Sequence, residues 1–277
     1  MSHSFTVTVG EARIPALGCG TWQLRGQECT DIVAEALRVG FRHIDTAQGY
    51  ANEAEVGAGI RAAGVARSEV FVTTKVRPDF ASKERLVRSV EESLEKLQVD
   101  VIDLLLIHWP NPDATVREMM EALSAAKRRG LARHIGASNF TIAMLDEAMA
   151  VSPEPLVTDQ VEYHPYVDQS RLLAAIRGHG LAITAYCPLG LGRVAEDATL
   201  REIGARYGKT PAQVGLRWLI QQGDVVAIPK TGTAARLREN FEVFDFALSR
   251  DDIARIDALP SSRDHLVNEP QWVAEWD

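Results

Sequence analysis

Residues 70–109 read VFVTTKVRPDFASKERLVRSVEESLEKLQVDVIDLLLIHW and contain the pattern that decides the fold. The β-branched run VFVTTK at Val70 predicts one strand, and VIDLLLIHW at Val101 predicts another. Between them, SKERLVRSVEESLEKLQ predicts a helix that starts on Ser82, with Glu84 and Arg85 in its first turn. Strands that alternate with helices in this way predict βαβ units and a parallel sheet.

The same alternation continues in both directions along the chain. Eight runs are strand candidates: LGCGT near Leu17, HIDT at His43, VFVTTK at Val70, VIDLLLIHW at Val101, HIGASN at His134, VTDQVEY at Val157, AITAYCP at Ala182 and VVAIPK at Val225. A second clear helix, TPAQVGLRWLIQQG, starts on Thr210 with Pro211 at its first helical position. FTVTV and ARIPAL precede the first unit and predict a hairpin. We therefore expect one α/β domain over residues 1–277, a (β/α)8 TIM barrel with an N-terminal β-hairpin.

An open, doubly wound sheet is the alternative fold. It is less favoured because no G-x-G-x-x-G motif follows the first strand candidate. The nearest glycine cluster, VGAGIRAAG from Val56, falls inside or after a helix, where we expect the glycines to serve helix packing.

Composition limits the classes of function. The chain has 277 residues, of which 46% are apolar and 25% charged, and its net charge of −8 argues against general binding to nucleic acid or anionic membranes. No apolar run approaches the roughly 20 residues needed to span a bilayer, and the N-terminal stretch lacks the pattern of a signal peptide. The three cysteines are scattered, so we expect no disulfides and a cytoplasmic location.

Polar groups stand at the ends of the strand candidates, where barrel enzymes place their chemistry. In chain order they are Thr21 and Trp22, Asp45 and Tyr50, Lys75, His108 and Trp109, Ser138 and Asn139, Gln160, Tyr186, and Lys230. A single lysine or histidine there could arise by chance. Asp, Tyr, Lys and His together, at or just past the ends of three different runs, are hard to explain by packing alone.

Several of these stretches resemble the aldo-keto reductases. The matching segments are GFRHIDTAQGYANE, VTTKV, DLLLIHWP, GASNF and IPKTG…R…EN, in the expected order from about Gly18 to Asn240. The short loops and the ending EWD resemble most the bacterial 2,5-diketo-D-gluconate reductase type, which is also associated with methylglyoxal reduction. The resemblance implies an NADPH-dependent carbonyl reductase in which Tyr50 donates a proton, Lys75 and Asp45 tune it, and His108 orients the substrate carbonyl.

Elementary electrostatics supports this assignment. A free phenol has a pKa near 10, so proton release at neutral pH costs roughly 4 kcal/mol. One ammonium about 4 Å away supplies on the order of 4 kcal/mol at an effective dielectric near 20. A buried lysine tends to lose its proton, and we expect Asp45 to keep Lys75 cationic so that Lys75 can acidify Tyr50. A structural Asp–Lys pair beside an inert Tyr50 is the less favoured alternative, given His108 on the same rim.

Other roles follow from the resemblance alone or from simple placement. Lys230, Thr231, Gly232, Thr233 and Arg236 would hold the 2′-phosphate of NADPH, although an ordinary helix start with a solvated basic face explains that stretch equally well when it is taken alone. The resemblance places Glu239 and Asn240 near adenine, Ser138, Asn139 and Gln160 on the nicotinamide carboxamide, and Tyr186 on the ring. It also places the stretch CPLGLG, especially Leu189 and Gly190, along the pyrophosphate. The expected cofactor site also includes Thr21 and Asp45.

Trp22 and Trp109 would form the apolar walls of the substrate pocket around Tyr50 and His108, and Trp272 and Trp276 are candidates for closing it. The short segment PNPDATV after Trp109 favours an open pocket that accepts many carbonyls. We read His164 as structural. No second His or Cys lies near His108 at ligand spacing, so we expect no metal site.

Two other functions remain open at this stage. One is a Schiff-base aldolase with Lys75 as nucleophile. The other is a non-enzymatic NADPH-binding subunit that regulates a partner. The carbonyl reductase is favoured, acting on small carbonyl substrates as a monomer.

Overall fold

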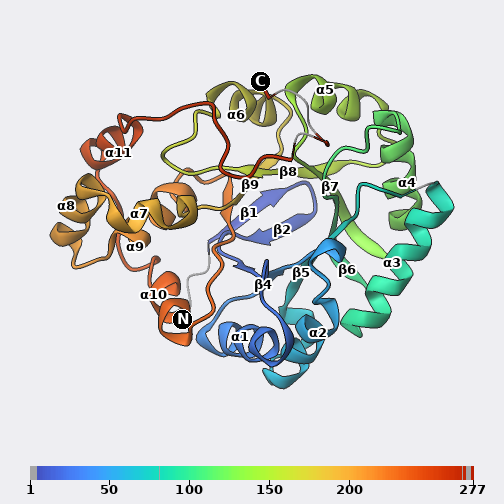
Figure 1. Cartoon of the computed structure of the whole chain (residues 1–277), viewed down its shortest axis with the longest axis horizontal. Helices are drawn as coiled ribbons and strands as arrows, with labels where there is room; N and C mark the ends of the chain where they lie inside the picture. The colour runs from blue at the N-terminus through green and yellow to red at the C-terminus, as the bar shows by residue number, and fades with distance from the viewer. Residues whose placement is uncertain (1–4, 81, 270, 273–275) are drawn as a thin grey trace.

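The computed structural model describes residues 5–80, 82–269, 271–272 and 276–277. It confirms the predicted hairpin and the predicted barrel (Figure 1). The hairpin pairs β1 (Thr6–Val9) with β2 (Ala12–Pro15) in antiparallel register and buries Val7, Ala12 and Ile14. Because the chain passes from this hairpin directly into the first barrel strand, the hairpin lies at the amino-terminal mouth of the barrel.

Eight parallel strands follow one another around the barrel in chain order. They are β3 (Cys19–Gly20), β4 (His43–Asp45), β5 (Phe71–Val76), β6 (Ile102–Ile107), β7 (Ala132–Ser138), β8 (Leu156–Glu162), β9 (Ala182–Tyr186) and β10 (Val225–Ala227). Parallel pairing of Leu17 with Ala227 and of Gly20 with Lys230 joins the first strand to the last. The Gly18 amide donates to Ala227 O at 2.8 Å, and the Ala227 amide donates to Ala16 O at 2.8 Å, so the sheet is closed.

Helices surround the barrel, as the ribbon in Figure 1 shows. They are α1 (Gly26–Val39), α2 (Glu53–Ala62), α3 (Lys83–Leu97), α4 (Val116–Arg128), α5 (Ile142–Val151), α6 (Ser170–Gly178), α7 (Arg193–Glu196), α8 (Ala198–Tyr207), α9 (Pro211–Ile220), α10 (Ala234–Phe241) and α11 (Arg250–Asp257), with the 3-10 helices η1 (Gln48–Tyr50), η2 (Arg67–Glu69) and η3 (Gly190–Gly192). No helix among the described residues is long and apolar enough to cross a membrane.

The two predicted helix starts are confirmed by their caps. Ser82 accepts a hydrogen bond from the Arg85 amide at the start of α3. Thr210 and Gln213 form a reciprocal capping box at the start of α9, with Pro211 at the first helical position. Each cap satisfies amides that have no partner within the helix, so these starts are set by local sequence.

Two of the three glycines in the cluster at α2, Gly57 and Gly59, serve helix packing, as predicted, whereas Gly64 follows the helix with φ +75° and has nothing within 4 Å of an added β-carbon. A β-carbon on Gly57 would lie 2.2 Å from the Leu97 carbonyl oxygen at the end of α3. A β-carbon on Gly59 would lie 2.7 Å from the Thr30 carbonyl oxygen of α1. Such distances are far inside van der Waals contact, so these glycines let α2 pack closely on its two neighbours.

Candidate active site

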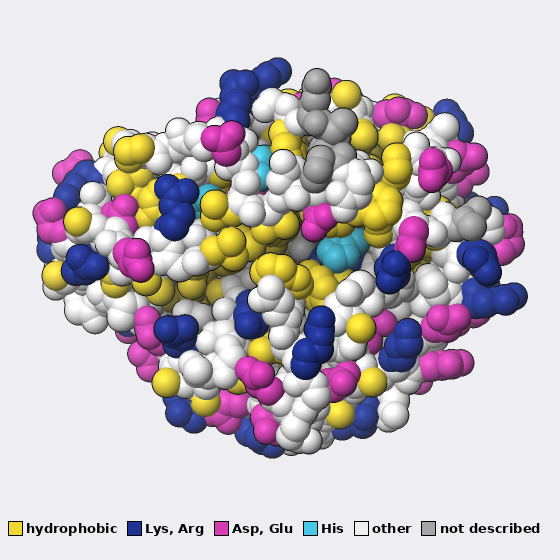
Figure 2. All heavy atoms as spheres, in the orientation of Figure 1, with side chains coloured by type: hydrophobic (Ala, Val, Ile, Leu, Met, Phe, Trp, Pro, Cys, Tyr) yellow, Lys and Arg dark blue, Asp and Glu magenta, His cyan; other side chains and the backbone are white. Residues whose placement is uncertain are grey.

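A cavity of about 700 Å³ opens at the carboxyl ends of the barrel strands. Figure 2 shows the corresponding hollow at the centre of the face, with hydrophobic side chains gathered around it. Sixteen of the residues predicted to form the site line the cavity: Thr21, Trp22, Asp45, Tyr50, His108, Trp109, Ser138, Asn139, Gln160, Tyr186, Leu189, Lys230, Thr231, Arg236, Glu239 and Asn240.

Four predicted residues do not line the cavity. Lys75 is fully buried beneath it. Gly190 is buried in η3 with φ +55°, against the rings of Tyr166 and His164. Gly232 leaves room for Glu28, whose Oε1 would lie 2.5 Å from a β-carbon at this position. Thr233 precedes α10 and donates its amide to Thr231 Oγ1 at 3.2 Å.

The floor of the cavity holds a chain of three ionisable groups. Lys75 Nζ donates to Asp45 Oδ1 at 2.5 Å, to the Thr46 carbonyl at 2.9 Å and to Tyr50 Oη at 3.4 Å. Asp45 ends β4 and Lys75 lies near the end of β5, which are adjacent strands in parallel register. Tyr50 lies in η1, immediately beyond β4. Parallel pairing of β4 with β5 thus brings together three groups that lie up to 30 residues apart in sequence.

Burial and neighbouring groups shift the pKa of Lys75 in opposite directions. Burial lowers its pKa, but Asp45 and Tyr50 outweigh burial, so the pKa of Lys75 lies above its ordinary value. The amine is therefore an ammonium at neutral pH. This agrees with the expectation that Asp45 keeps Lys75 cationic.

The pKa of Tyr50 shifts upward, whereas the sequence led us to expect that Lys75 would lower it. Burial raises the pKa of Tyr50 above its ordinary value, and the opposing effect of Lys75 offsets only part of the rise. The attraction of one ammonium lowers the phenol pKa, but loss of hydration of the phenolate raises it, and only the first effect can be worked out from sequence. Tyr50 is thus a protonated phenol at neutral pH, and Lys75 reduces the cost of forming its anion.

His108 lies beside the phenol and is uncharged. Its ring packs edge-on against the Tyr50 ring, with centroids 5.4 Å apart and planes at 79°. Burial first, and Lys75 second, hold the pKa of His108 well below its ordinary value. A neutral imidazole can donate a hydrogen bond to a carbonyl oxygen without adding charge to the pocket.

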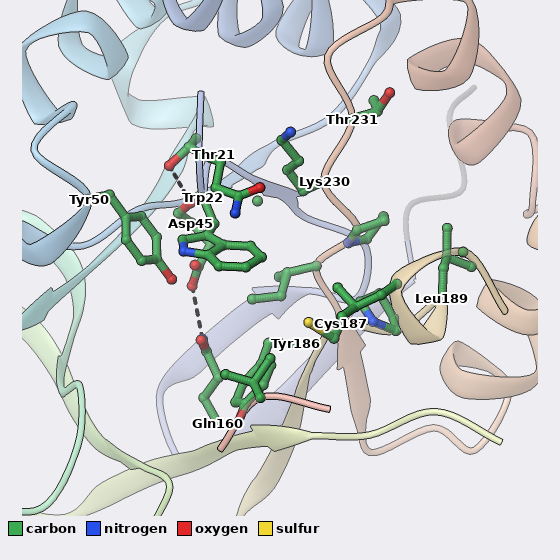
Figure 3. Close-up of a pocket in the computed structure, with 18 of the residues that line it drawn as sticks. Thr21, Trp22, Asp45, Tyr50, Gln160, Tyr186, Cys187, Leu189, Lys230 and Thr231 are labelled. Atoms are coloured by element: carbon green, nitrogen blue, oxygen red, sulfur yellow. Dashed lines mark hydrogen bonds between the residues drawn. The ribbon is translucent and has the colours of Figure 1, made fainter. Parts of the chain in front are cut away.

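Amide and hydroxyl groups from β7, β8 and β9 form a network on the cavity wall. Gln160 Nε2 donates to Asp45 Oδ2 at 2.9 Å, a bond drawn in Figure 3. Asn139 Nδ2 donates to the His108 carbonyl at 3.0 Å and to Ser138 Oγ at 3.1 Å, and Tyr186 Oη donates to Asn139 Oδ1 at 2.8 Å. These bonds fix the orientation of the polar side chains on this wall.

Two basic side chains, Lys230 and Arg236, line the cavity. In Figure 3, Tyr50 and Asp45 are on one side of the cavity, while Thr231 and Leu189 are on the other, with Lys230 between them. Within the described residues, neither Lys230 nor Arg236 forms an ion pair, although both line the cavity. Both cations are therefore available to an anionic group of a ligand.

Residues of the C-terminal tail also line the cavity, and sequence reasoning missed them. These are Val267 and Glu269. Of the two tail tryptophans that were candidates for closing the pocket, Trp276 packs on Trp109 with ring centroids 6.0 Å apart, and neither Trp272 nor Trp276 belongs to the cavity lining. Cys187, Pro188, Leu191 and Gly192 of the expected CPLGLG stretch line the cavity as well. Other lining residues that were missed are Gly20, Gln23, Gly49, Ala195, Ala212, Ile228 and Pro229.

A buried carboxylate at the end of β8 holds this tail in place. Glu162 accepts hydrogen bonds from the amides of Leu266 at 2.9 Å and Val267 at 2.8 Å. His164 Nδ1 accepts from the Tyr166 amide, so its Nε2 carries the proton that is donated to Glu162 at 2.9 Å. Burial raises the pKa of Glu162, but these hydrogen bonds outweigh burial and leave the pKa below its ordinary value. His164 is thus a buried, hydrogen-bonded residue, which agrees with the structural role expected of it.

Comparison with known proteins agrees with this geometry. Residues 16–260 match the family model described as "Aldo/keto reductase family". The chain is 41% identical over 267 residues to the methylglyoxal reductase DkgB of Escherichia coli O157:H7, covering 95% of this chain and 99% of the relative.

Two solved structures extend the likeness to three dimensions. One is of a protein provisionally named 2,5-diketo-D-gluconic acid reductase B, with TM-score 0.96, 47% identity, and coverage of 99% of this chain and 98% of that chain. The other is an aldo-keto reductase of Bombyx mori in complex with NADP, with TM-score 0.91, 31% identity, and coverage of 100% and 98%. The chain therefore belongs to the aldo/keto reductase family and is an oxidoreductase of the carbonyl-reducing kind.

Proposed function

We propose that this enzyme reduces small aldehydes and ketones to alcohols with NADPH, and that Tyr50 donates the proton. The observation that carries the proposal is the hydrogen-bonded chain from Asp45 through Lys75 to Tyr50 at the cavity floor, with distances of 2.5 and 3.4 Å. The phenol is protonated at neutral pH, as a proton donor must be before the reaction.

Four side chains have separate roles in delivering the proton. His108, as a neutral donor, polarises the carbonyl and directs its oxygen toward Tyr50. Tyr50 passes its proton to that oxygen as negative charge develops there. Lys75 stabilises the phenolate that remains, and Asp45 keeps Lys75 charged throughout. NADPH, when bound, supplies the hydride to the carbonyl carbon.

The residues present suit this cofactor. Ser138, Asn139 and Gln160 carry the amide and hydroxyl groups that a nicotinamide carboxamide can pair with, and Tyr186 offers a ring for stacking. Lys230 and Arg236 provide two cations for the 2′-phosphate, which NADH lacks. The Bombyx mori relative, whose structure contains NADP, adds support for a nicotinamide cofactor.

The choice of substrate rests on the walls and on the relatives. Trp22, Trp109 and Val267 make the substrate end largely apolar. Trp22 is 39% exposed, so the entrance is open and suits small carbonyl compounds. The relative in Escherichia coli is named for methylglyoxal, and we propose methylglyoxal as a substrate of this enzyme also. A monomeric state and a cytoplasmic location stay predictions.

A Schiff-base aldolase is poorly supported. Such an enzyme needs an uncharged amine with a free path to the substrate. Lys75 is fully buried, donates to three acceptors and remains an ammonium because of Asp45. A binding-only subunit is also disfavoured, because burying two charges costs several kcal/mol that cofactor binding alone does not require.

Turnover measurements test the proposal. NADPH absorbance at 340 nm should fall on addition of methylglyoxal or benzaldehyde. Tyr50→Phe should reduce kcat by at least about 10³-fold, within the range expected for general acid catalysis and electrostatic stabilisation acting together. NADPH binding, followed by fluorescence titration, should persist in Tyr50→Phe and show that the variant is folded. Substantial reduction of a good aldehyde by Tyr50→Phe would remove Tyr50 from the donor role.

A further inference from the structure

The charges in the cavity are unevenly distributed. Among the described residues that line it, the cations are Lys230 and Arg236, and the carboxylates are Asp45, Glu239 and Glu269. Both cations are assigned to the 2′-phosphate under the proposed function. The end of the cavity where the carbonyl reacts therefore has no lining cation left for a substrate anion.

The buried groups beneath this end do not supply a free positive charge. The ammonium of Lys75 is compensated by Asp45 at 2.5 Å and has no exposed surface. His108 is a neutral imidazole, because burial and Lys75 keep its pKa low. The ionisable groups at the floor thus sum to zero charge before the tail is considered.

The tail brings Glu269 into the cavity lining, and the same tail contacts the Trp109 wall. Trp276 packs on Trp109 and donates from its Nε1 to Asn268 Oδ1 at 3.5 Å, so the residue before Glu269 is tied to the Trp109 wall. Glu269 accepts a hydrogen bond from Gln271, which is neutral, and forms no ion pair within the part of the chain that the structure describes.

We propose that the site selects uncharged carbonyl substrates over carboxylated ones, and that Glu269 is a specificity-determining residue. The inference deepens the proposed function and rests on it. A substrate carboxylate would lose part of its hydration on entering, meet no free cation and approach the charge of Glu269. An uncharged dicarbonyl or aldehyde meets none of these costs. Reduction of 2,5-diketo-D-gluconate, which carries a carboxylate, should accordingly be poor.

A matched pair of substrates tests the selection. Methyl 4-formylbenzoate and 4-formylbenzoate present the same aldehyde on the same ring, and only the second is an anion at pH 7. We expect kcat/KM for the ester to exceed that for the carboxylate by about tenfold or more, since one nearby like charge in a partly solvated site has an effect of about 1.4 kcal/mol. The difference should shrink as salt is raised from 20 to 500 mM.

Variants identify the residue responsible. Glu269→Gln removes the charge and keeps the size, and should raise the carboxylate-to-ester ratio of kcat/KM several-fold. Glu269→Arg should raise it further. Glu121→Gln, which removes an exposed carboxylate of α4 outside the cavity, should leave the ratio unchanged.

The outcomes separate this inference from the proposed function. Equal kcat/KM for ester and carboxylate in the unaltered enzyme would overturn the inference while leaving carbonyl reduction intact. A ratio unchanged in both Glu269 variants would overturn the role of that residue. Failure to consume NADPH with either aldehyde would instead count against the proposed function.

Discussion

Replacing Lys75 with methionine removes the ammonium and keeps a side chain of similar length, which isolates its effect on Tyr50. The ammonium lies 3.4 Å from the phenol oxygen. At an effective dielectric of about 20, its attraction for a full phenolate charge at the 3.4 Å separation is about 5 kcal/mol. If about half of that charge has developed in the transition state, the loss is about 2.5 kcal/mol. The expected fall in the rate of reduction is therefore between about 10²- and 10⁴-fold, at about 1.36 kcal/mol per tenfold.

Single-turnover reduction of methylglyoxal, with NADPH already bound, measures this loss without interference from product release. Asp45 is then left as a buried carboxylate without its cation, which is costly for folding. The double variant Lys75→Met with Asp45→Asn removes that charge, and its melting curve should lie above that of the single variant. The proposal that Asp45 acts through Lys75 predicts that the double variant is no slower than the single one. A rate for Lys75→Met within tenfold of the unaltered enzyme would refute the electrostatic role of Lys75. A much slower double variant would show that Asp45 acts directly.

Three further predictions concern other parts of the molecule. Lys230→Ala should weaken NADPH binding by roughly tenfold or more, because a charge-assisted contact is lost. The affinity for NADH should be almost unaffected, and an equal loss of affinity for both cofactors would contradict a contact between Lys230 and the 2′-phosphate. Glu162→Gln should loosen the tail by weakening its bonds to the amides of Leu266 and Val267, which should raise KM several-fold with a smaller change in kcat; a loss confined to kcat would mean that the tail does not shape the substrate site. Burial lowers the pKa of His43 from 6.5 to about 4, so the unfolded chain binds a proton that the folded chain excludes. The contribution of His43 to the free energy of unfolding is therefore complete above about pH 6.5 and is lost as the pH falls toward 4. The lowering of its pKa from 6.5 to about 4 corresponds to a loss of up to about 3 kcal/mol. The difference in urea stability between pH 7.5 and pH 4.5 should be smaller in His43→Gln, and an equal difference in both proteins would argue against this assignment.

The barrel was predictable because its signals are local. Strand and helix periods, the Ser82 cap and the Thr210–Pro211 start each depend on residues within one or two turns of one another. Once eight strand–helix units are counted, the carboxyl ends of the strands must share one rim, and this places Asp45, Lys75 and His108 together without any coordinates.

The sequence did not reveal how the long connections fold. The simple alternation predicts a single helix after each strand. Instead, three helices, α7, α8 and α9, lie between β9 and β10, and α11 follows α10. Short helices such as α7 carry little periodic signal, and they form here because the surrounding barrel packs against them.

The sequence by itself determined the fold class and the identity of the residues at the floor of the site, since both follow from period, order and residue type. Only the tertiary structure decided that Glu162 holds the tail and that Val267 and Glu269 complete the cavity, through hydrogen bonds that join residues 104 and 105 positions apart. It also decided that burial outweighs Lys75 in setting the direction of the Tyr50 pKa. The physical reason is the same in each case: desolvation and long-range contacts depend on what surrounds a group in space, which the spacing of residues along the chain does not encode.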